Sequence, residues 1–312
     1  MDELKVFTGN AHPALAQAVT EYLGMSLGRA EVFEFSNENI FVRILDNVRQ
    51  RDTFVVQPIC SPVNKSLVEL LIMIDALKRA SAERITAVIP YYGYGRTDHK
   101  DQPRVPITAR LLADLLTTAG ANRVLTVDLH SSQIQGFFSV PVDELTALTL
   151  QSDYFREKGL EDLVVVATDI GISKRARDLA ARLNASLAIM EKRRLDNSGR
   201  TEILNVIGDV KGKVALVFDD EILTGGSILN TVNTVLDRGA REAYVCCTHP
   251  LFTSPAPENI TASPVKEVVV TDTVPVANDK NLDKLTILPI APLLGEAIHR
   301  IHSGQSVGAM FE

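Results

Sequence analysis

The residues with the clearest chemistry are the adjacent acids Asp219 and Asp220, in the segment VALVFDDEILTGGS. The apolar run at 214–218 predicts a strand covered on both faces, with the two acids where that strand would end. Carboxylates at such a point can accept hydrogen bonds from a vicinal diol. The residues TGGS at 224–227 then lead into a helical pattern, so free backbone N–H groups at the helix start would bind an anion. The segment predicts a ribose-phosphate site, and the alternative is an ordinary capped turn.

Two further predicted strands end at polar residues. Asp128 and His130 follow the apolar run before them, and Asp169 follows the run 163–167. Ligands of parallel sheets collect at the carboxyl ends of strands, and Mg²⁺ favours one or two carboxylates beside substrate phosphates. Asp169 also opens the turn DIGI before a helical pattern, which predicts a second anion cradle. Taken alone, His130 is also explained as a structural histidine, and DIGI as a capped turn.

A basic cluster lies in the segment EKRRLDNSGRTE, residues 191–202. Small polar residues follow the cluster and cannot form a core, so we expect a mobile surface loop. Lys192 and Arg194 would close over phosphates, because positive charge brought to a transferring phosphoryl group is the main catalytic device of such reactions. The alternative is a solvated run of charge.

Two segments of the first half suit a nucleotide. FEFSNEN places Phe35 beside Asn37, Glu38 and Asn39, and YYGYGRTDHK supplies Arg96. An aromatic ring can stack on a purine base while amide and carboxylate groups meet the edge of the base. Arg96 can pair with polyphosphate oxygens. Taken alone, Phe35 is more simply explained by core packing.

The elements that must position these residues form two series of strand-like and helical patterns. The first comprises residues 54–57, 67–80, 85–90, 107–119 and 124–128, and the second comprises 163–167, 174–183, 187–190, 213–218, 228–238 and 243–247. Strands alternating with helices predict a parallel sheet with crossover helices. We therefore expect an α/β fold with two domains and a boundary near residues 147–160.

Composition restricts the class of protein. With 312 residues, 46% hydrophobic and 23% charged, the chain is globular and long enough for about two domains. A net charge of −7 argues against nucleic acid as a partner. No apolar run reaches membrane length and the acidic N-terminus is unlike a signal peptide, so we expect a cytoplasmic protein that binds no membrane. Cys60, Cys246 and Cys247 lack a CxxC spacing and are expected to be buried.

These motifs occur together and in order along the whole chain, which resembles the ribose-phosphate pyrophosphokinase family. The segments that carry the resemblance are FEFSNEN, DLHSSQIQGFFSVPVDEL, ATDIGISKRA, EKRR, VFDDEILTGGS, CCTHPLF and QSVGAMF. The resemblance implies two tandem phosphoribosyltransferase-type domains, each a mainly parallel sheet flanked by helices. Residues 1–147 would form the ATP side and 148–312 the ribose 5-phosphate side, with the last helix packing back on the N-terminal domain.

The resemblance also implies a reaction. The β,γ-diphosphoryl group of ATP would pass to the anomeric hydroxyl of ribose 5-phosphate, giving 5-phosphoribosyl 1-diphosphate and AMP. Mg²⁺ would be the cofactor, and the protein would be a homohexamer built as a trimer of dimers.

Single residues acquire roles by the same resemblance. Lys192 is implied as the catalytic lysine and Arg194 as the charge-stabilising arginine, and His130 and Asp169 as the Mg²⁺ ligands. The implied ribose 5-phosphate contacts are Arg194, Asp219, Asp220, Leu223, Thr224, Gly225, Gly226 and Ser227. The implied ATP contacts are Phe35, Asn37, Glu38, Asn39, Arg96 and Thr97, with Phe35 against adenine across a subunit boundary.

Some positions depart from the family pattern. The family usually has an acid at Leu223, Thr at Ser227, Pro at Thr168, Gln at Thr97 and an acid at Asn39. Leu223 and Asn39 favour one alternative, a weakly active or inactive regulatory paralogue. A second alternative is a phosphoribosyltransferase, against which the ATP segments argue.

Overall fold

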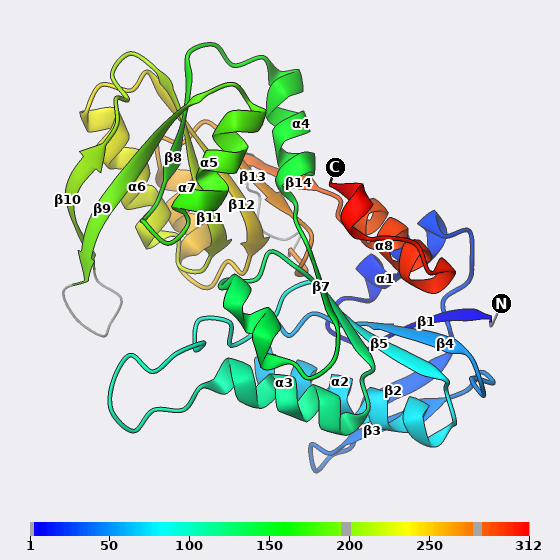
Figure 1. Cartoon of the computed structure of the whole chain (residues 1–312). Coiled ribbons are helices and arrows are strands. Elements are labelled where there is room, and N and C mark those ends of the chain that lie inside the picture. Colours follow the sequence, from blue (N-terminus) through cyan, green and yellow to red (C-terminus); the bar gives the residue numbers. More distant parts are fainter. Residues whose placement is uncertain (1–2, 195–200, 277–282, 312) are drawn as a thin grey trace. The chain divides into compact units, whose positions relative to one another are not determined.

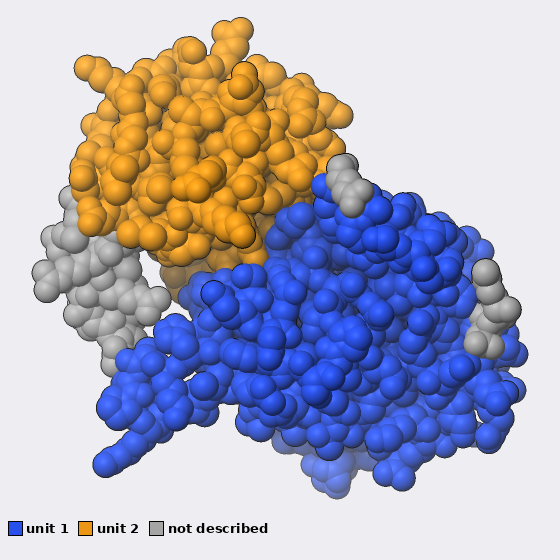
Figure 2. Space-filling model, in the orientation of Figure 1, with its two compact units in different colours: residues 1–146, 273–275, 289–312 blue, residues 147–272, 276–288 orange. Residues whose placement is uncertain are grey.

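The structure is a computed structural model that describes residues 3–194, 201–276 and 283–311. The chain divides into two compact units, which Figure 1 shows as a cartoon and Figure 2 in two colours. Unit 1 comprises residues 1–146, 273–275 and 289–312, and unit 2 comprises residues 147–272 and 276–288. The chain therefore returns to unit 1 for its last helix.

Unit 1 contains a five-stranded sheet in the order β1-β4-β5-β6-β7, in which every pairing is parallel. Its strands are β1 (Leu4–Thr8), β4 (Asp52–Val56), β5 (Arg84–Ile89), β6 (Arg123–Val127) and β7 (Val142–Leu145). Its helices are α1 (Pro13–Tyr22), α2 (Val63–Arg79), α3 (Thr108–Ala119), α8 (Ala291–Ser303) and the 3₁₀ helices η1 (Ser132–Phe137) and η2 (Gly308–Met310). All five residues of β4 are buried, as expected of a strand covered on both faces.

A separate antiparallel hairpin also belongs to unit 1. It consists of β2 (Ala30–Glu34) and β3 (Ile40–Ile44), and Val32 and Val42 pack against the core that α2 and α3 form with the sheet. Phe35 lies at the end of β2 and is 49% exposed. The alternative that Phe35 packs in the core is therefore wrong. Side chains alternate between the two faces of the hairpin, and the valines occupy the inner face.

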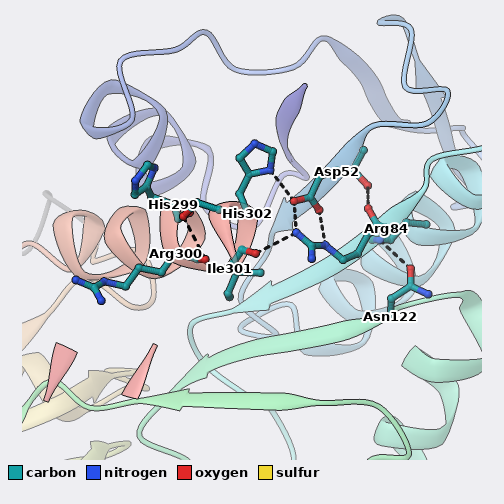
Figure 3. A network of polar contacts seen from close by, with 10 residues as sticks. Asp52, Arg84, Asn122, His299, Arg300, Ile301 and His302 are labelled. Carbon is teal, nitrogen blue, oxygen red and sulfur yellow. Dashed lines mark hydrogen bonds and ion pairs between the residues drawn. The ribbon is translucent and has the colours of Figure 1, made fainter. Parts of the chain in front are cut away.

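The C-terminal end of α8 is fastened to the first residues of β4 and β5 (Figure 3). Arg84 donates from Nε to Asp52 Oδ1 (2.8 Å) and from Nη2 to the other oxygen of that carboxylate. The same Nη2 donates to the carbonyl of Ile301 (3.1 Å), and His302 Nδ1 lies 2.8 Å from Asp52 Oδ2. Asp52 is thus the hub through which a helix more than 200 residues later is held in unit 1.

We expect Asp52→Asn to destabilise unit 1 by about 2 kcal/mol, because it leaves the partly buried Arg84 charge without its counterion. Thermal unfolding of the variant measures the effect. Asp75→Asn is the control, since Asp75 forms an exposed ion pair with Arg79 on α2 (2.6 Å) and such pairs contribute at most about 1 kcal/mol. Equal melting temperatures for the wild type and Asp52→Asn would contradict the role given to Asp52.

Unit 2 contains a seven-stranded sheet in the order β10-β9-β8-β11-β12-β13-β14. Its strands are β8 (Leu163–Ala167), β9 (Ser186–Arg194), β10 (Thr201–Ile207), β11 (Val214–Ile222), β12 (Glu242–Pro250), β13 (Val268–Thr271) and β14 (Leu285–Leu288). Its helices are α4 (Leu148–Lys158), α5 (Ser173–Arg182), α6 (Gly226–Asp237) and α7 (Ala256–Ala262). Among the described strands of unit 2, only the edge strand β10 runs antiparallel to its neighbour.

The central strand β11 is buried on both faces, as its apolar sequence predicts. Leu216 and Phe218 pack into a cluster with α4 and α5, whereas Ala215 and Val217 pack into a cluster with α6 and α7. The mainly parallel α/β fold expected from the alternation of strands and helices is therefore confirmed in both units. Among the helices of residues 3–194, 201–276 and 283–311, none combines the length and apolar character needed to cross a membrane.

Two expected element boundaries are wrong. β11 does not end at Asp219 but continues to Ile222, because β12 is equally long and pairs with it as far as Pro250. The segment expected to be a loop from residue 191 is in part a hairpin, since β9 runs to Arg194 and pairs with β10 from Thr201. Residues 195–200 lie outside the described chain.

The three cysteines are buried and free of disulfides, as expected. Cys246 and Cys247 lie in β12 and fill the clusters on opposite faces of the sheet. Burial raises the pKa of the Cys60 thiol to about 11. At neutral pH Cys60 is therefore a neutral, small core residue.

Candidate active site

The acidic pair and the loop after it form a continuous feature of unit 2. Asp219 and Asp220 lie in β11 beyond the last residue that pairs with β8, so only β12 flanks them in the sheet. Leu223 is half-buried, and Thr224, Gly226 and Ser227 are exposed. α6 begins at Gly226, where the first backbone N–H groups have no acceptor within the helix. The loop therefore offers N–H donors and a helix N-terminus to an anion.

Gly225 gives this loop its shape. Its φ is +77°, which L-residues rarely adopt, and the Cβ of any substituent would lie 3.9 Å from Ala256 Cα. The loop is also tied from outside, because Phe252 N donates to Ile222 O (3.0 Å) and Asn259 Nδ2 donates to Thr224 O (3.4 Å). Asn259 of α7 is a contact that the sequence reasoning missed, since nothing in its local pattern distinguishes it from any surface asparagine.

Asp219 is held in an environment that disfavours its charge. Burial and the adjacent negative charge of Asp220 raise its pKa well above the ordinary value, although a hydrogen bond from Thr168 acts in the opposite direction. Thr168 Oγ1 donates to Asp219 Oδ2 at 2.7 Å and is itself fully buried. The Thr168 side chain thus orients one acid of the pair. Its signal in the sequence was the place of Thr168 at the end of β8, beside β11.

The DIGI turn forms a second loop at the carboxyl end of the same sheet. Asp169 is exposed, and its Oδ1 accepts a hydrogen bond from the backbone N of Ile172 (3.1 Å). This bond fixes the carboxylate against the start of α5, where Ser173 begins the helix. Adjacent strands β8 and β11 therefore each present a carboxylate and a helix N-terminus, as the sequence predicted.

We expect Gly171→Ala to raise the Mg²⁺ concentration for half-maximal activity roughly tenfold, as for other residues that support a metal ligand. The added Cβ would lie 3.1 Å from Asp169 Oδ1, so the carboxylate must shift. Titration of activity with Mg²⁺ measures this. Gly136→Ala is the control, because a Cβ there meets nothing within 4 Å. Identical Mg²⁺ titrations for the two variants would contradict the role of Asp169.

In unit 1 the predicted ATP segment lies against the predicted metal ligand His130. Gly95 packs so closely on His130 that an added Cβ would be 3.3 Å from His130 Cβ. Arg96 and His130 are exposed, and Thr97 Oγ1 donates to Tyr94 O (2.7 Å), which closes the turn that carries Arg96. The fold therefore brings two segments that are far apart in the sequence to one place.

Asp98 joins these two segments and was not among the predicted site residues. Burial raises its pKa, but hydrogen bonds from His99 and Ser131 outweigh burial, so the pKa of the carboxyl is lowered. His99 Nδ1 lies 2.6 Å from Asp98 Oδ1. Asp98 therefore remains a carboxylate at neutral pH and connects the loop of Arg96 to the loop of His130.

The other predicted nucleotide residues form the tip of the β2–β3 hairpin. Phe35 N donates to Asn39 O (2.9 Å) and Asn39 N donates to Asn37 Oδ1 (3.3 Å). Glu38 has a φ of +66°, and the side chains of residues 35–39 are exposed. The tip is therefore a compact turn with an aromatic ring, two amides and a carboxylate open to a ligand.

Lys192 and Arg194 occupy the last residues of β9, paired with Ile203 and Thr201 of β10. The side chains of residues 192–204 lie outside the described part of the protein.

The donor set suits Mg²⁺ carried by a substrate. Within the described ranges, no three His, Cys, Asp or Glu side chains gather into a metal cage. The Asp169 carboxylate is exposed and oriented by the Ile172 amide, and a single carboxylate of this kind fits a cation whose other ligands are water and phosphate. Asp169 is thus the residue of unit 2 whose carboxylate could contribute a ligand to such a cation.

A mainly parallel sheet whose central strand carries an acidic pair, followed by an exposed glycine turn and a helix N-terminus, defines a phosphoribosyltransferase-type domain. A family model described as the N-terminal domain of ribose phosphate pyrophosphokinase matches residues 4–120, and one described as the phosphoribosyl synthetase-associated domain matches residues 198–312. The chain belongs to the ribose-phosphate pyrophosphokinase family.

Curated relatives match over nearly the full length. Ribose-phosphate pyrophosphokinase of Caldanaerobacter subterraneus is 51% identical over 99% of this chain and 98% of its own. The Clostridium perfringens protein of the same name is 50% identical with the same coverage. The crystal structure of phosphoribosylpyrophosphate synthetase from Mycobacterium smegmatis superposes with a TM-score of 0.92 at 44% identity, covering 97% of this chain and 100% of that one.

Proposed function

We propose that the protein transfers the β,γ-diphosphoryl group of ATP to the anomeric hydroxyl of ribose 5-phosphate, giving 5-phosphoribosyl 1-diphosphate and AMP. The bond from the sugar oxygen to the β-phosphorus forms as the bond from that phosphorus to the α-phosphate oxygen breaks, and the proton of the sugar hydroxyl is released to water. The acidic pair with its loop at the end of β11 carries the proposal, within a chain that matches its family along its whole length. Position 223 carries leucine and no acid, but the carboxylates of Asp219 and Asp220 are both present.

Each cluster has a part in this reaction. Asp219 and Asp220 would accept hydrogen bonds from the ribose hydroxyls, and the N–H groups of residues 224–227 would bind the 5-phosphate. Phe35 and the residues 37–39 would bind adenine, and Arg96 would bind the polyphosphate. Lys192 and Arg194 would offset the charge that develops on the migrating group. His130 and Asp169 are the proposed ligands of Mg²⁺, which when bound would further neutralise the phosphate oxygens.

The direct test is AMP formation by the purified protein from ATP, ribose 5-phosphate and Mg²⁺. We expect AMP and 5-phosphoribosyl 1-diphosphate in equal amounts. A phosphoribosyltransferase would instead release diphosphate only when given a nucleobase and 5-phosphoribosyl 1-diphosphate. A regulatory paralogue would catalyse neither reaction, and either outcome would overturn the proposal.

We further propose that the enzyme is cytoplasmic and assembles as a homohexamer, a trimer of dimers. The exposed aromatic side chains of the β2–β3 hairpin support an assembly, because Phe33 and Phe35 are 45% and 49% exposed and form one cluster. Light scattering of the purified protein gives the mass. A monomer at micromolar concentration would overturn this part.

A further inference from the structure

The β2–β3 hairpin is tied to helix α2 at a first point through an ion pair. Lys65 Nζ lies 2.6 Å from Glu34 Oε2, and the two side chains are 43% and 35% exposed. The hydrogen bond to Glu34 and its charge raise the pKa of Lys65, so the lysine stays protonated in any neutral buffer. Glu34 is the last residue of β2 and adjoins Phe35, the first residue of the tip.

A second tie lies one helical turn further along α2. Glu69 is almost fully buried, and its carboxylate accepts hydrogen bonds from the backbone N and the side-chain Nδ2 of Asn10. The same Asn10 Nδ2 donates to Val32 O in β2 at 3.2 Å, which uses the second hydrogen of the amide. Gln57 Nε2 donates to Glu69 Oε1 (2.7 Å) and keeps the carboxylate in place.

These ties matter because a two-stranded hairpin is marginally stable by itself. On its outer face the rings of Phe33, Phe35 and Phe41 pack against one another, with ring centroids 4.8–5.8 Å apart. The direction of the tip is therefore set on the inner face by the valine packing and by the two polar ties. Lys65 and Glu69 are four residues apart, so both lie on the same side of α2.

We propose that Lys65 and Glu69 are positioning residues that orient the β2–β3 hairpin, and with it residues 35–39, for binding the base of a purine nucleotide. The nucleotide part of this inference rests on the proposed function. The orientation of the hairpin does not, because it follows from contacts within unit 1. The two parts can therefore be tested separately.

The test uses the full-length protein and the variant Lys65→Met, which keeps the length of the side chain and removes its charge. Hydrogen–deuterium exchange of the amides of residues 30–44 measures how firmly the hairpin is held. Calorimetric titration with a non-hydrolysable ATP analogue, and separately with ribose 5-phosphate, measures the affinity for each ligand. We expect faster exchange in the hairpin and an affinity for the analogue about fivefold lower, the upper range for an exposed ion pair. Affinity for ribose 5-phosphate should be unchanged.

Two variants serve as controls. Lys65→Arg keeps the charge and should restore both readouts, whereas Arg79→Met removes an ion pair at the other end of α2 and should leave both unchanged. Asn10→Ala breaks the second tie while keeping the backbone hydrogen bond to Glu69, and should add to the effect of Lys65→Met. It avoids the burial of unpaired donors that loss of Glu69 would cause.

Each outcome decides a part of the proposal. Unchanged exchange of residues 30–44 in the double variant Asn10→Ala, Lys65→Met would overturn the positioning role. Faster exchange with unchanged affinity for the ATP analogue, or with an equal loss for ribose 5-phosphate, would overturn the nucleotide role alone. A wild-type protein that forms no AMP would overturn the proposed function and leave the exchange result valid.

Discussion

Replacing Lys192 by alanine should lower kcat by about 1,000-fold, with KM for ATP and ribose 5-phosphate changed by less than about threefold. In the transfer of a diphosphoryl group the protein supplies positioning and charge, with little covalent chemistry. A cation that acts on charge present only in the transition state contributes to turnover and little to substrate binding. Steady-state AMP formation with each substrate varied in turn measures both constants.

The hairpin of β9 and β10 supplies the matched control for this prediction. Arg193 is the neighbour of both Lys192 and Arg194 in β9 and has no predicted role in the reaction. Arg193→Ala removes the same charge from the neighbouring residue and should retain most of the activity. Near-normal turnover of Lys192→Ala, or equal losses for both variants, would remove the role given to Lys192.

The second large effect is expected from Asp219→Asn. The variant should raise KM for ribose 5-phosphate about 100-fold, because hydrogen bonds to a charged acceptor contribute about 1.5–3 kcal/mol each. KM for ATP should remain close to that of the wild type. Asp209→Asn makes the same substitution in an exposed turn of unit 2, where Asp209 Oδ1 accepts a hydrogen bond from Lys211 N (3.0 Å), and should leave both constants unchanged.

The same variant should be more stable than the wild type when no ligand is bound. Burial and the charge of Asp220 raise the pKa of Asp219, so the folded state holds a proton there that the unfolded state releases at lower pH. This carboxyl therefore lowers the free energy of unfolding as the pH rises from the ordinary pKa towards the pKa in the folded state. The lowering persists at higher pH. The neutral amide introduced by Asp219→Asn would carry no such cost, so we expect a melting temperature higher by a few degrees at pH 8, with a difference that shrinks as the pH is lowered towards the ordinary pKa of 3.8. A lower melting temperature at pH 8 would contradict the electrostatic account of Asp219.

Asp219→Asn is thus expected to weaken the binding of ribose 5-phosphate and to stabilise the free protein, and both effects follow from the same pair of acids. Asp219 and Asp220 are adjacent in β11, and one of them is oriented by a buried hydroxyl from Thr168. Like charges held together are unfavourable until a ligand supplies donors to them. The acids therefore stabilise a bound sugar at a cost to the free protein, as is common at functional sites.

Prediction from the sequence succeeded for features that depend on residues close together in the chain. The strand β8 and the helices after the two loops lie within one or two residues of their predicted positions, because apolar runs and 3.6-residue periods reflect local geometry. The predicted end of β11 was wrong, because the strand continues to Ile222. The length of a strand depends on its partner, here β12. The alternative of core packing for Phe35 also failed, because the hydrophobic character of a residue does not reveal which face of a hairpin it occupies.

The sequence by itself determined the strand-loop-helix motifs, the order of the clusters and the family, since each depends on residues that are neighbours in the chain. Only the tertiary structure decided that Thr168 orients Asp219, that Gly95 packs on His130, and that Glu69 reaches the hairpin through Asn10. These contacts join residues far apart in the chain, 59 positions in the case of Asn10 and Glu69, or strands adjacent only in the sheet. Such pairings depend on the packing of whole elements, which no local pattern of residue types encodes.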